Sequence, residues 1–299
     1  MEFRSVFVSN PAQLSVRRGQ LVIRQGAETT IPIEDISSLL LESRAISVTA
    51  AALQELADCG VTVYLCDPTH LPAAIVLPIN RHSRQFKLLK GQIAMTRPTQ
   101  KRIWQSVASA KIANQGRCLT LLGHPEGEEL RFLAAQVRSG DPDNLEAAAA
   151  ARYFPVLFGP GFTRGDECRI NAALNYGYAI LRGAVARNLA VRGLEPCLGI
   201  FHHSELNQFN LADDLMEPYR PLVDLYVASQ VPDDDGPLTP AIKQQLFHLT
   251  NYLVEQKKKR FRTITAIGHM VDSFSRMVQG EAGPMELPVL LPLEPYHYE

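Results

Sequence analysis

The pattern of hydrophobic and polar positions changes near residue 78. Before it, apolar and polar side chains alternate with a period of two, which is typical of strands with one buried face. This alternation predicts short strands at residues 3–9, 13–17, 21–25, 29–33, 36–41 and 61–66. The segment 48–59 has helical spacing instead, with Ser47 or Thr49 as its cap and Gly60 at its end. The first part of the chain is therefore predicted to be a small β-strand domain with one helix.

Beyond residue 78, apolar positions recur at helical spacing. The predicted helices span residues 81–94, 99–122, 126–139, 145–154, 167–191, 218–229, 239–259 and 263–279. A proline-rich tail from about residue 280 is expected to be extended. The predicted fold class is α+β in two domains. They are an N-terminal β-rich dimerisation domain at residues 1–78, a polar linker at 79–86, and an all-α C-terminal catalytic domain at 87–299.

Composition narrows the class of protein. With 46% hydrophobic and 20% charged residues, the chain reads as a soluble globular protein. No apolar run reaches the length of a membrane span, and the five cysteines show no Cys-x-x-Cys spacing. These features predict a cytoplasmic protein with reduced thiols and no membrane association. The net charge of −1 gives no global sign of nucleic-acid binding, although basic clusters recur after residue 78.

Candidate chemistry gathers late in the chain, where His202 and His203 precede Asp214 and Glu217 with no cysteine among them. Carboxylates with one imidazole suit Mn²⁺ or Mg²⁺ better than a structural zinc ion, which favours thiolates. Asp214 and Glu217 are three residues apart, so a helix would present them on one face. The pattern predicts a metal-dependent phosphodiester site.

Each of these residues also has an ordinary structural interpretation. The adjacent histidines would point to opposite sides of a strand or turn, so at most one is expected to be a ligand. Asp213 or Asp214 could cap the following helix. Pro218 disfavours α geometry at the residue before it, which weakens the shared-face argument. Asp224, four residues after Arg220, is expected to be its ion-pair partner rather than a ligand.

A further candidate carboxylate, Glu146, opens the helix predicted at 145–154. Asp143 or Asn144 can cap that helix, which places Glu146 in its first turn, where the helix dipole favours a negative charge. Alone, Glu146 would be interpreted as a capping carboxylate. Joined to the later histidine and Asp-x-x-Glu pair, it is better interpreted as a metal ligand.

Together these motifs resemble the CRISPR-associated protein one family, the adaptation integrases. The stretch from His202 to Pro221 looks most like members from type II systems, and the resemblance covers nearly the whole chain. The residues that carry it are Glu146 with Ala149-Ala150 and Tyr153-Phe154, then Gly199-x-x-His202, then Asp214-x-x-Glu217 with Arg220-Pro221 and Asp224.

For the site, the resemblance implies that Glu146, His202 and Glu217 hold a Mg²⁺ or Mn²⁺ ion. Asp214 would be a nearby supporting acid among the catalytic residues. His202 is preferred because it completes Gly-x-x-His, and His203 is the alternative.

For function, the resemblance implies an integrase with DNA endonuclease activity. It would insert the 3′-hydroxyl ends of double-stranded spacer DNA into the CRISPR array at the leader–repeat junction by transesterification. The implied assembly is a homodimer, two of which flank a dimer of the small second adaptation protein in a heterohexamer. The type II effector nuclease is a further candidate partner. A plain metal-dependent DNA nuclease and a non-catalytic DNA-binding scaffold are the alternatives.

Overall fold

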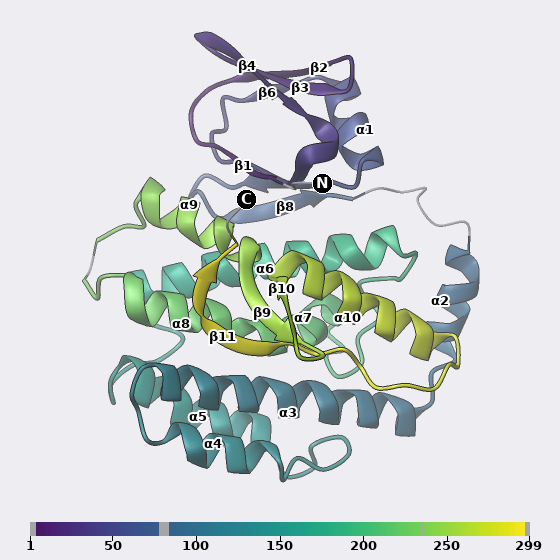
Figure 1. Ribbon diagram of the computed structural model, residues 1–299, viewed down its shortest axis with the longest axis vertical. Helices are drawn as coiled ribbons and strands as arrows, with labels where there is room; N and C mark the ends of the chain where they lie inside the picture. Colours follow the sequence, from purple (N-terminus) through teal and green to yellow (C-terminus); the bar gives the residue numbers. More distant parts are fainter. Residues whose placement is uncertain (1–3, 78–83, 235, 297–299) are drawn as a thin grey trace.

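The computed structural model describes residues 4–77, 84–234 and 236–296. Figure 1 shows a β-rich N-terminal part stacked on a larger, mainly helical part. Within the described ranges, no helix is both long enough and apolar enough to cross a membrane.

The N-terminal part holds two sheets, and its strand pattern confirms the prediction from period-two alternation. The first sheet has the order β4-β3-β2-β6, and the second has the order β1-β5-β7-β8 with β1, β5 and β7 parallel. Helix α1, Ala50–Asp58, is capped by Thr49, whose side chain accepts a hydrogen bond from the Ala52 N–H at 3.3 Å. The strands are β1 (Arg4–Val8), β2 (Gln13–Arg17), β3 (Gln20–Gln25), β4 (Ala27–Pro32), β5 (Ile36–Leu41), β6 (Ser47–Val48), β7 (Thr62–Cys66) and β8 (Pro72–Val76).

The second sheet is shared between two hydrophobic cores. Neighbouring side chains of a strand point to opposite faces, so Leu39 and Val63 enter the small N-terminal core while Leu40 and Tyr64 enter the large helical one. Tyr64 donates a hydrogen bond to the Ile180 carbonyl at 2.8 Å. The two parts of the chain are therefore packed against each other through this sheet.

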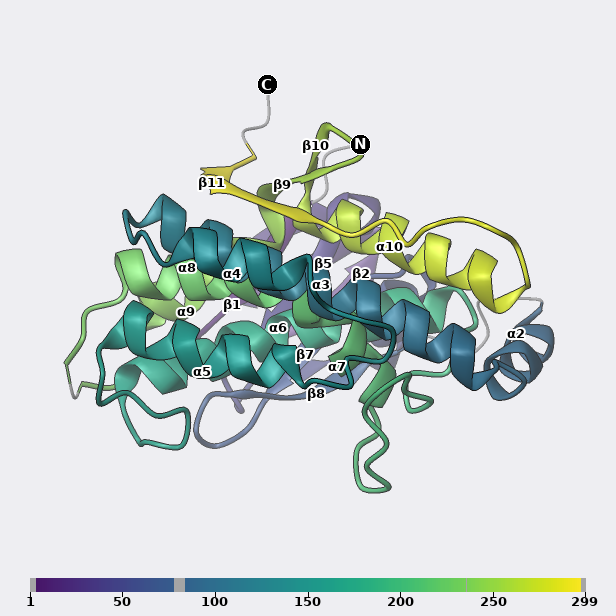
Figure 2. The same cartoon turned by 90° about the horizontal axis from the view of Figure 1, so that it is seen from below.

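The helical part surrounds a long buried helix, α6 (Arg169–Val191). Helix α3 (Arg97–Leu121) crosses one side of this part, as Figure 2 shows, and packs on α4, α5 and α8. The other helices are α2 (Gln85–Ile93), α4 (Gly127–Ala134), α5 (Leu145–Phe158), α7 (Asn210–Met216), α8 (Arg220–Gln230), α9 (Pro240–His248) and α10 (Thr263–Val278). Most of the predicted linker, residues 79–83, lies outside the described residues.

The prediction of an all-α C-terminal domain is wrong. A third sheet, β10-β9-β11, lies across the helices and is built from Lys259–Arg262, Tyr252–Gln256 and Val289–Pro295. The helix predicted at 239–259 is instead α9, a 3-10 turn over Leu249–Asn251, and strand β9. The tail expected to be extended is extended, and it pairs with β9 as strand β11.

A hairpin turn explains the error. Lys257 and Lys258 connect β9 to β10 and both have positive φ, at 53° and 61°. Two-residue hairpin loops of this kind usually carry glycine or asparagine. A lysine run reads as the solvated end of a helix, so the sequence concealed the turn.

Candidate metal centre

Glu146 stands in the first turn of α5, as predicted, but a different residue caps the helix. Asp141 accepts hydrogen bonds from the first two helical N–H groups, those of Leu145 and Glu146, both at 2.9 Å. Asn144 is left-handed with φ 51° and makes no side-chain cap, and Asp143 pairs with an arginine instead. The predicted cap was therefore wrong, because a tight turn brings the more distant Asp141 back over the helix end.

Glu217 begins a 3-10 turn, Glu217–Tyr219, between α7 and α8. Glu217 itself keeps helical dihedral angles, φ −50° and ψ −44°, so the expectation that Pro218 disfavours α geometry at this residue is wrong, although the regular α-helix gives way to a 3-10 turn here. Asn114 of α3 donates a hydrogen bond to the Pro218 carbonyl at 2.8 Å and so fixes the turn against α3. The Glu217 side chain is only 4% exposed. A buried carboxylate needs compensating charge, which its neighbours supply.

Two cationic side chains contact the Glu217 carboxylate. Lys111 Nζ lies 2.5 Å from Oε2, and Arg220 Nε lies 3.2 Å from Oε1. Burial alone would raise the pKa of Glu217, but the charges of Lys111 and Arg220 outweigh it and lower that pKa. The Arg220 guanidinium also stands 4.6 Å over the Tyr178 ring. Glu217 is therefore held ionised.

The same ammonium joins Glu217 to Glu146. Lys111 Nζ donates a hydrogen bond to Glu146 Oε1. Carboxylates from α5 and from the α7–α8 turn thus converge on a single positive charge from α3. Glu146 is the more open of the two, with 22% of its side chain exposed.

The expected pairing of Arg220 with Asp224 is replaced by other contacts. Asp224 accepts hydrogen bonds from the Tyr153 hydroxyl, at 3.0 Å, and from the Tyr178 hydroxyl. Burial raises the pKa of Asp224 to about 6, against the opposing effect of these hydrogen bonds. Asp224 is thus a buried structural acid behind the site.

Asp214 is fully buried and holds the loop that carries His202. Its carboxylate accepts hydrogen bonds from the backbone N–H groups of Ile200 at 2.5 Å, Phe201 at 2.9 Å and His202 at 3.1 Å. His202 Nδ1 also lies 2.7 Å from Asp214 Oδ1. An ionised carboxylate only accepts, so Nδ1 carries the proton and Nε2 is left to face a ligand. Asp214 is therefore placed to orient the imidazole.

Neighbouring contacts distinguish the two histidines. Phe201 stacks on Trp104 of α3 with ring centroids 4.0 Å apart, and His202 meets the same tryptophan edge-on. His203 is exposed and lines a separate cavity of about 400 Å³ with Asn210 and Phe274. The two imidazoles thus face different surroundings, as expected for adjacent residues.

The charge of Glu217, one of the two converging carboxylates, acts on His202. Its hydrogen bond to Asp214 is the main cause that raises the pKa of His202, against burial, and the charge of Glu217 adds to the rise. Among the described residues, however, no three His, Cys, Asp or Glu side chains are already grouped at metal-binding distances.

The donors nevertheless fit a hard divalent cation. Glu217 Oε2 is buried and lacks a partner with hydrogen-bonding angles, although Lys111 is close. Both Glu217 Oε2 and Glu146 Oε1 contact the Lys111 ammonium, and the charge of Glu217 acts on the His202 imidazole. Carboxylate oxygens and one imidazole are the ligand types that Mg²⁺ and Mn²⁺ accept.

Comparison with known proteins places the chain in a family. The family model described as CRISPR associated protein Cas1 matches residues 6–235, which includes Glu146, His202, Asp214 and Glu217. The chain belongs to the Cas1 family. The CRISPR-associated endonuclease Cas1 of Neisseria meningitidis serogroup C (strain 8013) is 45% identical over 304 aligned residues, covering all of both chains.

Solved structures share the fold of this Cas1-family chain at low sequence identity. A casposase bound to an integration product has a TM-score of 0.77 at 18% identity and covers 96% of this chain and 93% of its own. A Cas6-RT-Cas1–Cas2 complex has a TM-score of 0.70 at 18% identity, covering 93% of this chain and 35% of the matched chain. The mixed fold, β-rich first and helical afterwards, is thus one that this family and its structural neighbours share.

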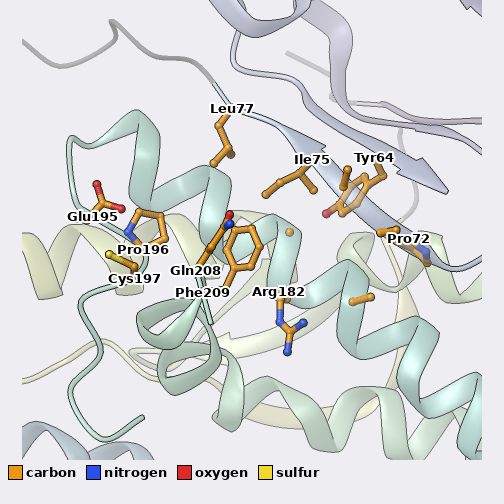
Figure 3. Close-up of a pocket in the computed structure, with 14 residues that line it drawn as sticks. Tyr64, Pro72, Ile75, Leu77, Arg182, Glu195, Pro196, Cys197, Gln208 and Phe209 are labelled. Carbon is orange, nitrogen blue, oxygen red and sulfur yellow. The ribbon is translucent and has the colours of Figure 1, made fainter. Parts of the chain in front are cut away.

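A well-formed cavity lies elsewhere in this Cas1-family protein. It measures about 570 Å³ and is lined largely by apolar groups, between strand β8 and helix α6. Figure 3 shows Ile75 and Leu77 on one side, and Arg182 and Phe209 on the other. The four predicted site residues do not line it. Its apolar walls do not suit phosphodiester chemistry, so the convergent carboxylates are the better candidate site.

Lys111 is the site residue that sequence reasoning missed. A signal was available, because it falls on the buried stripe of α3 with Val107, Ala108 and Ile112. A lysine on an apolar face must find an anion, since an unpaired buried charge is costly. Which carboxylates it meets depends on long-range packing that one sequence does not display.

Proposed function

We propose that this Cas1-family protein is a DNA integrase and endonuclease of CRISPR adaptation. It joins the 3′-hydroxyl ends of spacer DNA to the CRISPR array at the leader–repeat junction. The observation that carries this proposal is the convergence of Glu146 and Glu217 on the single ammonium of Lys111. Full-length identity of 45% to a Cas1 endonuclease supports the same reaction class.

The site residues have different proposed roles. Glu146, Glu217 and the Nε2 atom of His202 would hold Mg²⁺ or Mn²⁺. When bound, the cation supplies Lewis-acid chemistry, polarising a phosphoryl oxygen and stabilising charge on the attacking or leaving oxygen. Asp214 keeps the proton on His202 Nδ1 and fixes the ring. Arg220 keeps Glu217 ionised and oriented.

Strand transfer needs no nucleotide cofactor. A 3′-hydroxyl attacks a phosphodiester and a strand 3′-hydroxyl leaves, so the bonds formed and broken are equivalent. The reaction is therefore expected to run in reverse on branched DNA. Water in place of the attacking hydroxyl would give hydrolysis at the same site, which accounts for endonuclease activity.

DNA and protein partners follow from the same proposal. Lysines and arginines on α2 and the start of α3 are exposed and can neutralise phosphates: Lys87, Lys90, Arg97, Lys101 and Arg102. Binding to spacer DNA is expected to weaken steeply with salt. The fold shared with a Cas6-RT-Cas1–Cas2 complex supports a second adaptation protein as partner, and the proposed assembly is a homodimer, two of which flank a dimer of that small protein.

A joining assay tests the reaction. The purified protein, with and without its small partner, receives Mn²⁺ or Mg²⁺, a labelled 3′-hydroxyl duplex and a supercoiled plasmid carrying a leader and repeat. Joined product that is lost with EDTA and with Glu146→Ala is expected. Asp143→Asn is the matched control, because this exposed neighbour is paired with Arg138 and lies outside the site.

The other outcomes separate the alternatives. Cleavage without joining would identify a plain nuclease. DNA binding with no reaction in the presence of the partner would favour a scaffold, and full joining by Glu146→Ala would overturn the assigned site.

A further inference from the structure

Lys111 occupies the point on which the two candidate metal carboxylates converge. Its ammonium contacts Glu146 Oε1 and Glu217 Oε2, yet it comes from α3, which carries neither carboxylate. Its side chain is only 9% exposed, so these contacts are less screened by water than a surface ion pair. In the structure, the Lys111 ammonium supplies the positive charge that a bound metal ion would otherwise supply.

The charges around this point favour either the Lys111 ammonium or a divalent metal ion there, but not both at once. Glu146 and Glu217 contribute two negative charges, and Lys111 and Arg220 contribute two positive charges. A divalent ion added beside Lys111 would leave a double positive excess in a largely buried site, which is unfavourable. If the ammonium leaves, the excess is a single charge, which one phosphodiester of bound DNA cancels.

The scaffold allows the side chain to move while the helix stays. Asn114, one turn along α3 from Lys111, donates hydrogen bonds to the carbonyls of Pro218 at 2.8 Å and Pro288 at 3.0 Å. These contacts anchor α3 to the Glu217 turn and to the C-terminal tail. The lysine side chain is a flexible four-carbon stem, and the partly exposed Glu146 marks the side that is open to solvent.

We propose that Lys111 is a placeholder for the catalytic cation. In the metal-free protein its ammonium holds the Glu146 and Glu217 carboxylates around one point, and a divalent ion binds there by displacing it. This inference rests on the proposed function, since it takes Glu146 and Glu217 as ligands. Lys111 is thus a positioning residue that competes with the metal.

Lys243 offers a matched control. It is also 9% exposed and lies 2.9 Å from the buried carboxylate of Glu42, in contact with neither Glu146 nor Glu217. Removing either lysine removes a buried ion pair, but only Lys111 contacts the proposed metal ligands. A difference between the two variants therefore reports on the metal rather than on burial.

The test measures Mn²⁺ affinity and thermal unfolding of Lys111→Met, Lys243→Met and the unaltered protein. Free Mn²⁺ is followed by electron paramagnetic resonance during titration. We expect Lys111→Met to bind Mn²⁺ more tightly, on the order of tenfold or more. Without metal it should unfold at a lower temperature, and saturating Mn²⁺ should close most of that gap. Lys243→Met should also unfold earlier, with unchanged Mn²⁺ affinity.

Lys111→Gln is a second variant, because its amide can still donate hydrogen bonds to both carboxylates and so protects folding. It is expected to show the same rise in affinity. Unchanged or weaker Mn²⁺ binding by both Lys111 variants, with binding by the unaltered protein intact, would overturn the placeholder and leave the metal site standing. Absence of Mn²⁺ binding in every protein would overturn the placeholder and the metal-dependent function together.

Discussion

Two buried lysines in this chain are paired with glutamate, and their surroundings differ. Lys243 of α9 meets the single carboxylate of Glu42, which follows β5, between the helical part and the N-terminal sheet, and the half-exposed His70 lies 3.5 Å from the same carboxylate. Lys111 meets two carboxylates from separate elements, one of them partly exposed. One buried lysine that meets one buried carboxylate is a structural ion pair between two packed elements. Carboxylates that gather from distant elements around one ammonium, with an opening to solvent, indicate a site for another cation.

The largest expected effect is on activity. Glu217→Gln removes a proposed ligand charge and is expected to lower the joining rate on the order of 10³-fold, as losses of central catalytic groups do. The measurement is single-turnover joining with saturating DNA. Glu42→Gln, the equivalent change at the packing pair, should leave the rate of the folded protein unchanged. Near-normal joining by Glu217→Gln would remove it from the site.

The next effect is on stability. Lys243→Met leaves the buried Glu42 carboxylate with only the half-exposed His70 imidazole, 3.5 Å away, which is expected to lower the free energy of unfolding by about 3–5 kcal/mol. Urea unfolding followed by circular dichroism measures this. The double variant Lys243→Met/Glu42→Leu should regain most of the loss, because the uncompensated charge is gone. A single variant as stable as the unaltered protein would show that the pair is not needed for packing.

Asp214→Asn tests positioning without removing a proposed ligand. The amide keeps one accepting oxygen and turns an NH₂ group, which cannot accept, toward either the Ile200 and Phe201 N–H groups or the two His202 donors, so the ring loses its fixed position and Mn²⁺ affinity is expected to fall about 10–100-fold. Isothermal titration calorimetry measures the change. Asp213→Asn is the neighbouring control, since Asp213 pairs with Arg182 instead. Equal effects of the two variants would contradict the positioning role.

The smallest expected effect is on pH dependence: Mn²⁺ affinity should rise with pH, while the stability of the metal-free protein should fall. The hydrogen bond to Asp214 raises the pKa of His202 above its ordinary 6.5, and a metal ligand must be neutral. Mn²⁺ affinity should therefore rise as pH increases through that raised pKa. The paired imidazolium stabilises the metal-free protein below pH 6.5, and this contribution is lost as pH rises through the raised pKa.

His202→Gln should remove both pH dependences, and His203→Gln should keep them. Thermal unfolding without metal and Mn²⁺ titration, each measured across pH, supply the comparison. Loss of the dependence in His203→Gln alone would reverse the choice of histidine.

The spacing of hydrophobic residues predicted much of the fold, because many side chains in each strand or helix follow the same period. The strands at β2 and β5 have the predicted bounds, and Thr49 is one of the two predicted caps. Strand β8 escaped prediction because Pro72 opens it and its alanines carry little alternation. The third sheet was not predicted because its hairpin turn places Lys257 and Lys258 at positive φ. Neither residue is the glycine or asparagine that usually indicates such a turn.

The sequence indicated the residue types of the candidate site but not how their side chains come together. Glu146, His202 and Glu217 were singled out by chemistry and spacing, whereas Asp141 as the cap of α5 and Lys111 between the carboxylates were not. Both depend on side chains meeting across a turn or across helices. Such contacts follow from tertiary packing, which one sequence does not reveal.

The most direct test of the metal centre is a crystal structure of the protein with Mn²⁺, using anomalous scattering to locate the ion. The expected result is a peak bounded by Glu146, Glu217 and His202 Nε2, with the Lys111 ammonium moved from its place between the carboxylates. A peak at His203 or away from Glu217, or a lysine still bridging both carboxylates in Mn²⁺-saturated protein, would contradict it.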